Sequence, residues 1–246
     1  GETAGLFSTR AWKDRDEMYR RMKEGTLFST DLAGPCKAAR KVWGVPDSEP
    51  IHWKLGVVTC SSEKVGALLS HYSKVYLLIV NTPEECVIGG DSDGVDEVVR
   101  RLKCHWYPID GVTTVHCDVA KPVEKAYHDL HIFPTNPPAG VRYYSGAWGK
   151  SYDVSSETAA ASILAQALDG VHYPKVIDAA YDDDIRTFLE MGPGASCSRM
   201  IPKILGDRPH LAISACYPSP SENHTFLRFL GKLIGHQFSM NLDFLY

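Results

Sequence analysis

Hydrophobic and polar positions along the chain follow the periods of helices and of strands, and these patterns predict its elements. Residues 1–12, 14–25 and 32–46 read as three helices, the last ending at Gly44 with Pro46 beyond it. From residue 53 onward, short apolar runs bounded by turn residues alternate with amphipathic runs. They predict strand, helix, strand, strand, helix and strand at residues 53–60, 61–72, 74–81, 84–90, 91–102 and 103–110. This order is typical of a split-βαβ, ferredoxin-like unit.

The second half returns to alternating helices and strands. We expect helices over residues 155–168, 173–184, 195–205 and 225–236, and strands at 185–190 and 209–216. The helix from 155 carries a capping box, with Ser155 or Ser156 facing a nearby acidic residue. The pattern therefore predicts an α/β domain interrupted by a compact ferredoxin-like insertion, with a cleft between the two lobes as the place for a site.

Composition narrows the function classes. The 246 residues are 44% hydrophobic and 23% charged, with a net charge of −4 and no arginine-rich run, so we expect no nucleic-acid partner. No apolar stretch is long enough for a membrane span. The seven cysteines are odd in number and lack a C-x-x-C pair. We therefore expect reduced thiols, a cytoplasmic location, and neither a disulfide framework nor a structural zinc site.

Four local motifs carry possible chemistry. MGPGAS, residues 191–196, joins a strand to a helix; a structural glycine turn is favoured there over an anion cradle. His128 and His131 have helical spacing but no third ligand, which favours surface histidines over a metal site. A buried, inert Cys117 is favoured over a nucleophile. His116 lies at the boundary between the predicted lobes, where imidazole suits general-base catalysis.

Three stretches together resemble the malonyl-CoA:ACP acyltransferase family. They are VNTPEECVIGG (80–90), VHCDV (115–119) and RTFLEMGPGASCSRMI (186–201). The resemblance implies an α/β-hydrolase-like acyltransferase core, incomplete at the N-terminus, with an inserted ferredoxin-like subdomain. GLFSTRAWKD (5–14), YYSGAW (143–148) and LGKLIGHQFSMNLDFLY (230–246) further resemble the acyltransferase domains of polyunsaturated fatty acid synthases and heterocyst glycolipid synthases.

The same resemblance implies a division of the chain into four parts. Residues 1–52 are expected to belong to the core after the nucleophile elbow, and residues 53–111 to form the ferredoxin-like subdomain. Residues 112–210 return to the core, and residues 211–246 form a C-terminal strand, a helix and a segment that packs back on the domain.

The resemblance also implies the site residues. Gly1 and Glu2 match the end of the family's G-x-S-x-G-E motif and begin the elbow helix, so the nucleophilic serine is expected two positions before residue 1. His116 matches the catalytic base. A backbone carbonyl orients this histidine in the family, and counting back from E-x-G-P-G assigns it to Asp169. Asn81 matches an asparagine near the acyl pocket.

Substrate and partners follow from the family. The implied reaction moves malonyl, or another acyl group, from CoA to the phosphopantetheine of an acyl carrier protein, with no bound cofactor and with a ketosynthase among the neighbouring domains. Malonyl-using members carry an arginine at the position of Glu24, so Arg20 or Arg21, one turn earlier, is the candidate for binding the free carboxylate. The alternatives are a non-catalytic docking module and a hydrolase for stalled acyl thioesters.

Overall fold

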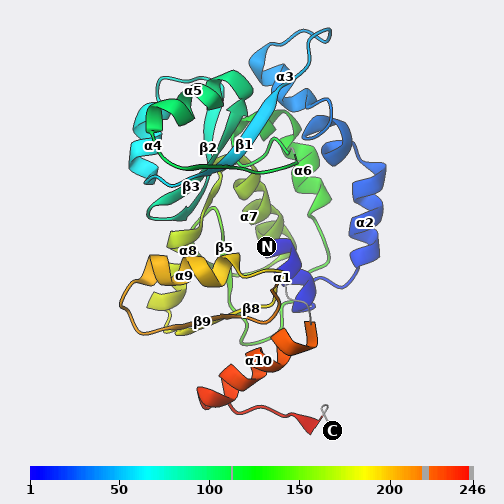
Figure 1. The fold of residues 1–246 in the computed structure, drawn as a ribbon. Coiled ribbons are helices and arrows are strands. Elements are labelled where there is room, and N and C mark those ends of the chain that lie inside the picture. Colours follow the sequence, from blue (N-terminus) through cyan, green and yellow to red (C-terminus); the bar gives the residue numbers. More distant parts are fainter. Residues whose placement is uncertain (112, 218–221, 244–246) are drawn as a thin grey trace. The chain divides into compact units, whose positions relative to one another are not determined.

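The computed structural model describes residues 1–111, 113–217 and 222–243 (Figure 1). The chain divides into two compact units, Gly1–Ala180 and Tyr181–Tyr246. The four-part division expected from the resemblance stays a prediction. No helix among the described residues is both long and apolar enough to cross a membrane.

A five-stranded sheet organises the first unit, with the strand order β4-β1-β3-β2-β7. Its strands are β1 (Trp53–Val58), β2 (Val75–Thr82), β3 (Glu85–Asp91), β4 (Trp106–Pro108) and β7 (Val171–His172). The first four pair antiparallel, whereas β7 runs parallel to β2. Helices α4 (Ser62–Leu69) and α5 (Ser92–Leu102) complete this region. The predicted order of six elements over residues 53–110 is therefore confirmed.

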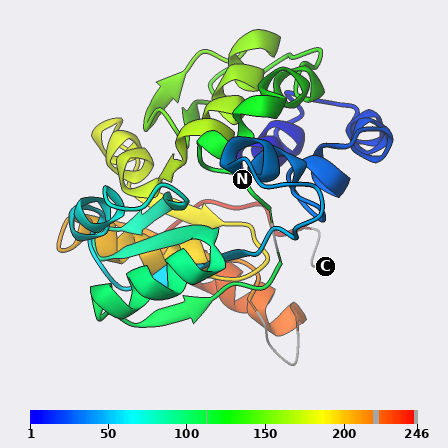
Figure 2. The ribbon, with the colours of Figure 1, turned by 90° about the horizontal axis from the view of Figure 1, so that it is seen from above.

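Helices cover both faces of this sheet (Figure 2). Successive side chains of a strand point to opposite faces. Val58 of β1 accordingly packs in one hydrophobic cluster with residues of α4 and α5. Trp53, on the other face, packs with α3 (Lys37–Trp43) and with residues Cys117 and Val119. One face of the sheet thus packs against the segment around residue 117.

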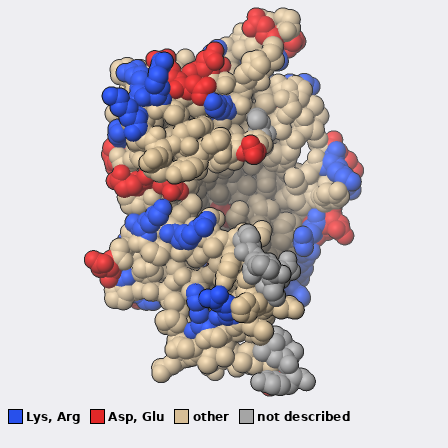
Figure 3. Space-filling view, viewed as in Figure 1, with Lys and Arg blue, Asp and Glu red and all other residues tan. Residues whose placement is uncertain are grey.

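Polar side chains and a glycine mark the helix ends in this region. The hydroxyl of Ser61 accepts the backbone N–H of Lys64 at the start of α4, and the Asp91 carboxylate caps α5. Gly44 ends α3 in a left-handed conformation. Helix α5 is acidic in its first turn and basic in its last, which complements the helix dipole. Figure 3 shows acidic and basic side chains gathered over this part of the surface.

Three aromatic rings stack where α3 meets the sheet. The Trp43 and Trp53 rings lie 5.4 Å apart at 8°, and the Trp53 and Tyr76 rings lie 6.0 Å apart at 9°. The indole N–H of Trp43 donates to the Tyr76 hydroxyl at 2.9 Å. This stack fixes α3 against β1 and β2, and Cys117 belongs to the same cluster.

The rest of the first unit is mainly helical. It contains α1 (Glu2–Ser8), α2 (Arg15–Glu24), a π-helix at Leu27–Asp31, a 3-10 helix at Asp118–Val123, α6 (Glu124–Leu130), α7 (Ser156–Asp169), α8 (Tyr173–Asp182, which continues into the second unit) and the hairpin of β5 (Tyr143–Ser145) and β6 (Lys150–Tyr152). Trp12 and Phe133, both fully buried, stack at its centre with ring centroids 5.0 Å apart. Ser155 caps α7 as expected, but its partner is Thr158 rather than an acidic residue.

The second unit pairs two short parallel strands with two helices. Strands β8 (Thr187–Glu190) and β9 (Leu211–Ser214) are in parallel register from Thr187 opposite Leu211. Helix α9 (Ser196–Leu205) lies between them in the chain, and α10 (Glu222–Gly235) follows. Phe229 and Leu233 of α10 pack on Ile213 of β9.

One expectation about the cysteines is wrong. Cys60 and Cys104 form a disulfide, with Cα atoms 6.2 Å apart. The two residues are 44 positions apart in sequence, so spacing alone gave no sign of the pair; β1 and α5 bring them together in the fold. Cys36, Cys86, Cys117, Cys197 and Cys216 are free thiols.

Candidate active site

His116 lies in the segment between β4 and the 3-10 helix at Asp118–Val123, and its backbone is left-handed, with φ of 68°. A non-glycine residue in this region is strained and persists where its surroundings hold it. The surroundings here are the carbonyl groups at the C-terminal end of α7. The ring atom Nδ1 of His116 lies 2.7 Å from the carbonyl oxygen of Gln166. The backbone N–H groups of His116 and Cys117 both donate to the carbonyl of Ala167, at 2.8 and 3.1 Å.

This docking has a simple origin in helix chemistry. The last four carbonyl groups of an α-helix have no partner within the helix. Gln166 and Ala167 belong to the last turn of α7, which ends at Asp169. Their carbonyls therefore need donors from elsewhere, and the His116 segment supplies them.

The contact with Gln166 sets the chemistry of the imidazole. A carbonyl oxygen only accepts hydrogen bonds, so Nδ1 carries the proton and Nε2 carries the lone pair. Burial lowers the pKa of His116 below its usual value of 6.5, against the opposing effect of the Gln166 carbonyl. His116 is therefore neutral at neutral pH and has its basic nitrogen Nε2 available, as a general base requires.

The carbonyl oxygen that faces His116 belongs to a different residue from the one expected. The expected orienting residue was Asp169, but the bond is made by Gln166, three positions earlier and slightly less than one helical turn away. A backbone carbonyl leaves no side-chain signature in a sequence. The signal that points to Gln166 is the position of Gly170, because the residue that ends a helix defines which carbonyls before it lack partners.

Gly170 holds the end of α7 close to the sheet. Its φ is 86°, and a Cβ at this position would lie 2.7 Å from the carbonyl oxygen of Leu78 in β2. Glycine is therefore required both for the left-handed turn and for the close approach. The chain continues directly into β7, where Val171 pairs with Ile79. His116 and the carbonyl that faces it are in this way fixed to β2.

Cys117, next to His116, has the properties of a packing residue. Its side chain is buried, and burial raises the pKa of its thiol to about 12. The thiolate is the nucleophilic form of cysteine, and this thiol is fully protonated at neutral pH. The interpretation of Cys117 as an inert neighbour is consistent with this environment.

Glu2 connects the start of α1 to the same site. Gly1 is the N-cap of α1, and Glu2 is its first residue. The Glu2 carboxylate accepts hydrogen bonds from the Tyr152 hydroxyl and, at 2.5 Å, from the side-chain amide of Gln166. Desolvation by burial raises the pKa of Glu2 above its usual value. The family resemblance implied for Glu2 only the start of the elbow helix, and nothing in the sequence pointed to Tyr152.

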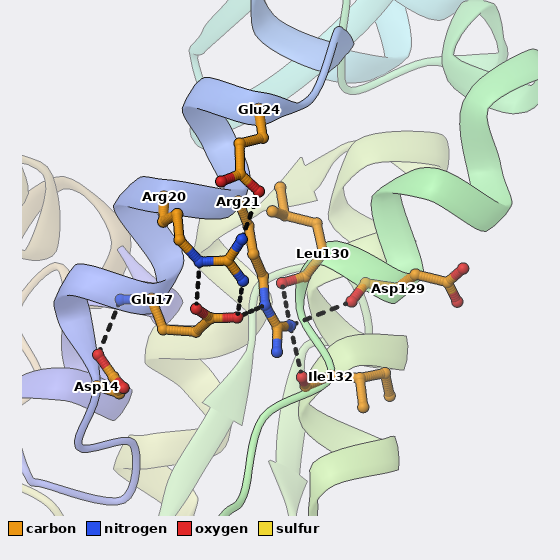
Figure 4. Close-up of polar contacts among 8 residues, drawn as sticks. All are labelled: Asp14, Glu17, Arg20, Arg21, Glu24, Asp129, Leu130 and Ile132. Carbon is orange, nitrogen blue, oxygen red and sulfur yellow. Dashed lines mark hydrogen bonds and ion pairs between the residues drawn. The ribbon is translucent and has the colours of Figure 1, made fainter.

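The two candidate arginines on α2 differ in their surroundings (Figure 4). Both guanidinium groups bond Glu17, which lies between them, and hydrogen bonds from Arg20 and Arg21 hold the pKa of Glu17 at about 2. Arg20 also pairs with Glu24, and its side chain is 56% exposed. Arg20 is thus a surface group held by two carboxylates.

Arg21 is fixed to the main chain. It donates to the carbonyl oxygen of Ile132 at 2.8 Å, with longer contacts to those of Asp129 and Leu130 (Figure 4). Its guanidinium carbon also lies 4.3 Å from the centre of the Phe133 ring. Arg21 therefore fastens α2 to the segment that follows α6.

Asn81 lies at the end of β2, where its exposed fraction is only 9%. Its side-chain amide donates to Glu85 at 3.1 Å, across the turn between β2 and β3. The structure therefore gives Asn81 a role in holding this hairpin. Its expected place near an acyl group stays a prediction.

After β8, the glycine-rich turn leads into α9, and the N-terminus of α9 is already capped by a carboxylate of the same chain. The carboxylate of Glu190 accepts the backbone N–H groups of Cys197 and Ser198, at 3.2 and 2.7 Å, at the start of α9. Gly192 and Gly194 both have positive φ, at 60° and 100°. This geometry fits the structural interpretation of the turn, because the helix N-terminus that an anion would use carries Glu190 instead.

His128 and His131 contact different partners. His128 faces Glu157 at 3.1 Å. His131 is 5% exposed, and its Nδ1 lies 2.7 Å from the carbonyl oxygen of Tyr127. Within the described parts of the chain, three or more metal-binding side chains nowhere gather into a cluster.

Comparison with known proteins gives the fold a precedent. No protein-family model matches the sequence, and no curated protein matches it. Solved structures do match. The acyltransferase domain from module 8 of the salinomycin polyketide synthase has a TM-score of 0.72 and 16% sequence identity, over 98% of this chain and 54% of that one. Malonyl CoA-acyl carrier protein transacylase from Clostridium perfringens has a TM-score of 0.63 and 15% identity, over 95% and 82%.

A third match is a complex of a type II polyketide synthase acyl carrier protein with its malonyl-transacylase, with a TM-score of 0.62 and 17% identity, over 78% of this chain and 62% of that one. The chain spans about half the length of two acyltransferase domains of the salinomycin polyketide synthase that it matches, at 51% and 54%. The chain therefore has the mixed α/β fold of acyltransferase domains.

Proposed function

We propose that this chain forms part of an acyltransferase that moves an acyl group from CoA to the phosphopantetheine thiol of an acyl carrier protein. One observation carries the proposal: His116 is held by Nδ1 on the Gln166 carbonyl, which leaves Nε2 as the base. Proteins of the same fold include malonyl-CoA:acyl carrier protein transacylases, and one of them is in complex with a carrier protein. The reaction needs no bound cofactor.

The nucleophile of the proposed reaction is a serine two positions before Gly1. Nε2 of His116 takes the serine proton while the serine oxygen attacks the carbonyl carbon of the acyl-CoA thioester. The C–S bond breaks, the acyl-serine ester forms, and the proton on Nε2 passes to the departing CoA thiolate. The carrier thiol then gives its proton to Nε2 and attacks the ester, and the serine oxygen recovers the proton.

The domain context of the proposal comes from the resemblance. We place the chain with the acyltransferases of polyunsaturated fatty acid and heterocyst glycolipid synthases, where a ketosynthase is a neighbouring domain. The β1–β4 region is proposed as a ferredoxin-like insertion, which the strand order β4-β1-β3-β2 supports. The end of residues 230–246, which contributes to the resemblance, lies outside the described residues from 244 onward.

Acyl transfer is tested in the protein carrying the residues upstream of Gly1. We expect radiolabelled malonyl-CoA or another acyl-CoA to label the protein and then a carrier protein. His116→Ala should abolish both steps, because the serine loses its base. Failure of every acyl-CoA to label a protein that contains the serine contradicts the proposal. Carrier binding without turnover would instead identify a docking module, and release of the acyl group to water a hydrolase.

The acyl group is proposed to be malonyl, with Arg20 as the group that binds its carboxylate. Arg20 supports this role because its present partners are the carboxylates of Glu17 and of the exposed Glu24, which a substrate carboxylate can replace, whereas Arg21 is also held by main-chain carbonyls. We expect Arg20→Ala to raise the KM for malonyl-CoA about 10- to 100-fold, the equivalent of one lost charge-assisted pair. Acetyl-CoA, which lacks the carboxylate, is the matched control. An equal effect on both substrates contradicts the assignment.

A further inference from the structure

The carboxylate of Glu2 is bound on two sides without a cationic side chain among the partners recorded for it. The Tyr152 hydroxyl and the Gln166 side-chain amide donate to it. A carboxylate held away from water costs free energy unless donors replace its hydration. Glu2 thus fixes the groups that donate to it, since releasing any of them leaves a partly buried carboxylate short of a partner.

Gln166 makes two different contacts. Its main-chain carbonyl accepts from Nδ1 of His116 at 2.7 Å, and its side-chain amide donates to Glu2 at 2.5 Å. The amide also lies against Gly146, where an added Cβ would come within 2.9 Å of Oε1 of Gln166. The side chain of Gln166 therefore lies between Glu2 and Gly146.

These contacts join two distant segments. Glu2 is the first residue of α1, and Gln166 belongs to the last turn of α7. The sequence of contacts from Glu2 to Gln166 to His116 runs through hydrogen bonds alone. A shift of α1 relative to α7 would break the bond between Glu2 and Gln166, so the bond fixes the base relative to the start of α1.

We propose that Glu2 is a positioning residue for His116. Through Gln166 it holds the imidazole at a fixed distance and orientation from the N-terminal end of α1. The catalytic meaning of this role rests on the proposed function, which places the nucleophile immediately before that end. A misplacement of about 1 Å between reacting groups can cost about 100-fold in rate, so a bond that spans the two segments has a measurable effect.

The test uses the protein that carries the upstream serine, with Glu2→Ala, Gln166→Ala and the double variant. Gln166→Ala removes the side-chain amide but keeps the main-chain carbonyl that faces His116. We expect each single variant to lower kcat about 10- to 100-fold with KM within about two-fold. The double variant should lose no more than the worse single variant, because both changes break one bond. Glu97→Gln, an exposed carboxylate of α5, is the matched control and should leave kcat unchanged.

A second readout follows His116 directly, by NMR titration of its ring nitrogens without substrate. The Gln166 carbonyl supports the protonated imidazole, so we expect the pKa of His116 to fall in Glu2→Ala and in Gln166→Ala. Losses in kcat that multiply in the double variant, or an unchanged His116 titration in both single variants, overturn the proposal. Glu2→Gln keeps the shape of the side chain and replaces Glu2→Ala if the latter does not fold. Absence of turnover in the unsubstituted protein overturns the proposed function alone, because the titration still decides the positioning role.

Discussion

The backbone of His116 has a φ of 68°, a conformation that costs a non-glycine residue roughly 1–3 kcal/mol. Three hydrogen bonds to the end of α7 offset this strain, two from backbone N–H groups and one from the ring. In this conformation Nδ1 of the ring faces the Gln166 carbonyl, and Nε2 is left available as the basic nitrogen. Loss of the ring bond alone would leave the strained backbone with less to hold it.

For single residues, the sequence identified the candidate side chains better than it identified the groups that bond them. His116 was found from its position between predicted lobes and from the resemblance, whereas Gln166 acts through a carbonyl that every residue possesses. Arg21 was a candidate because of its charge. The structure shows that charge directed at main-chain oxygens, which the sequence does not reveal.

His131 provides a pH-dependent prediction outside the candidate site. Burial lowers the pKa of His131 from 6.5, so below pH 6.5 the unfolded chain binds a proton more readily than the folded protein. The free energy of unfolding is therefore retained above pH 6.5 and falls as the pH decreases through the folded pKa. We expect His131→Gln to lose less stability than the unsubstituted protein between about pH 7.5 and about pH 5.5 in urea unfolding. Exposed His71→Gln is the control, and equal losses in all three proteins contradict the prediction.

At the scale of elements, helix ends explain much of the site. The end of α7 receives the His116 segment, and the start of α9 receives Glu190. In both cases the backbone groups that a helix leaves without partners are bonded by a residue distant in sequence or on a neighbouring strand. The candidate base is thus placed by the same requirement that stabilises ordinary helix ends.

The elements themselves were largely predictable, because their signals are local. Periodicity located the six elements of residues 53–110, and Gly44 marks a helix end where the sequence indicates it. The π-helix at Leu27–Asp31 and the two-residue strand β7 were not predicted. Segments this short contain hardly more than one period of a hydrophobic pattern, so tertiary contacts decide their form.

Gly170 provides a prediction for the junction of α7 with β2. Gly170→Ala places a methyl group 2.7 Å from the Leu78 carbonyl on a backbone with φ of 86°. We expect the free energy of unfolding to fall by about 1–3 kcal/mol from backbone strain, with overlap adding to it, in urea unfolding. Gly66→Ala in α4, where an added Cβ meets nothing within 4 Å, should instead raise stability by up to about 1 kcal/mol. Equal stability of the two variants contradicts this account of Gly170.

At the scale of the whole molecule, one covalent link closes the region that carries the four antiparallel strands. The Cys60–Cys104 disulfide spans 44 positions and encloses α4, β2, β3 and α5. A cross-link of this span reduces the conformational entropy of the unfolded chain. The odd number of cysteines therefore concealed one bonded pair, and the two partners become neighbours only through the complete topology of the sheet.

Reduction of this disulfide gives the prediction at this scale. A closed loop of 44 residues corresponds to about 4 kcal/mol of stabilisation in the chain-entropy model. We expect a phosphine reductant to lower the urea midpoint of the protein accordingly. The Cys60→Ser, Cys104→Ser double variant should start at the lower midpoint and show no response to the reductant. An unchanged midpoint on reduction, with the bond verified as broken, contradicts the prediction.

The stacked rings of Trp43, Trp53 and Tyr76 also provide an intrinsic spectroscopic signal. Nearly parallel indole and phenol rings, 5.4 and 6.0 Å apart, are close enough for their electronic transitions to couple. Their near-ultraviolet circular dichroism therefore records whether α3 is seated on the sheet. Because Cys117 and Val119 belong to the same cluster, the signal follows the support beneath His116 without any added label.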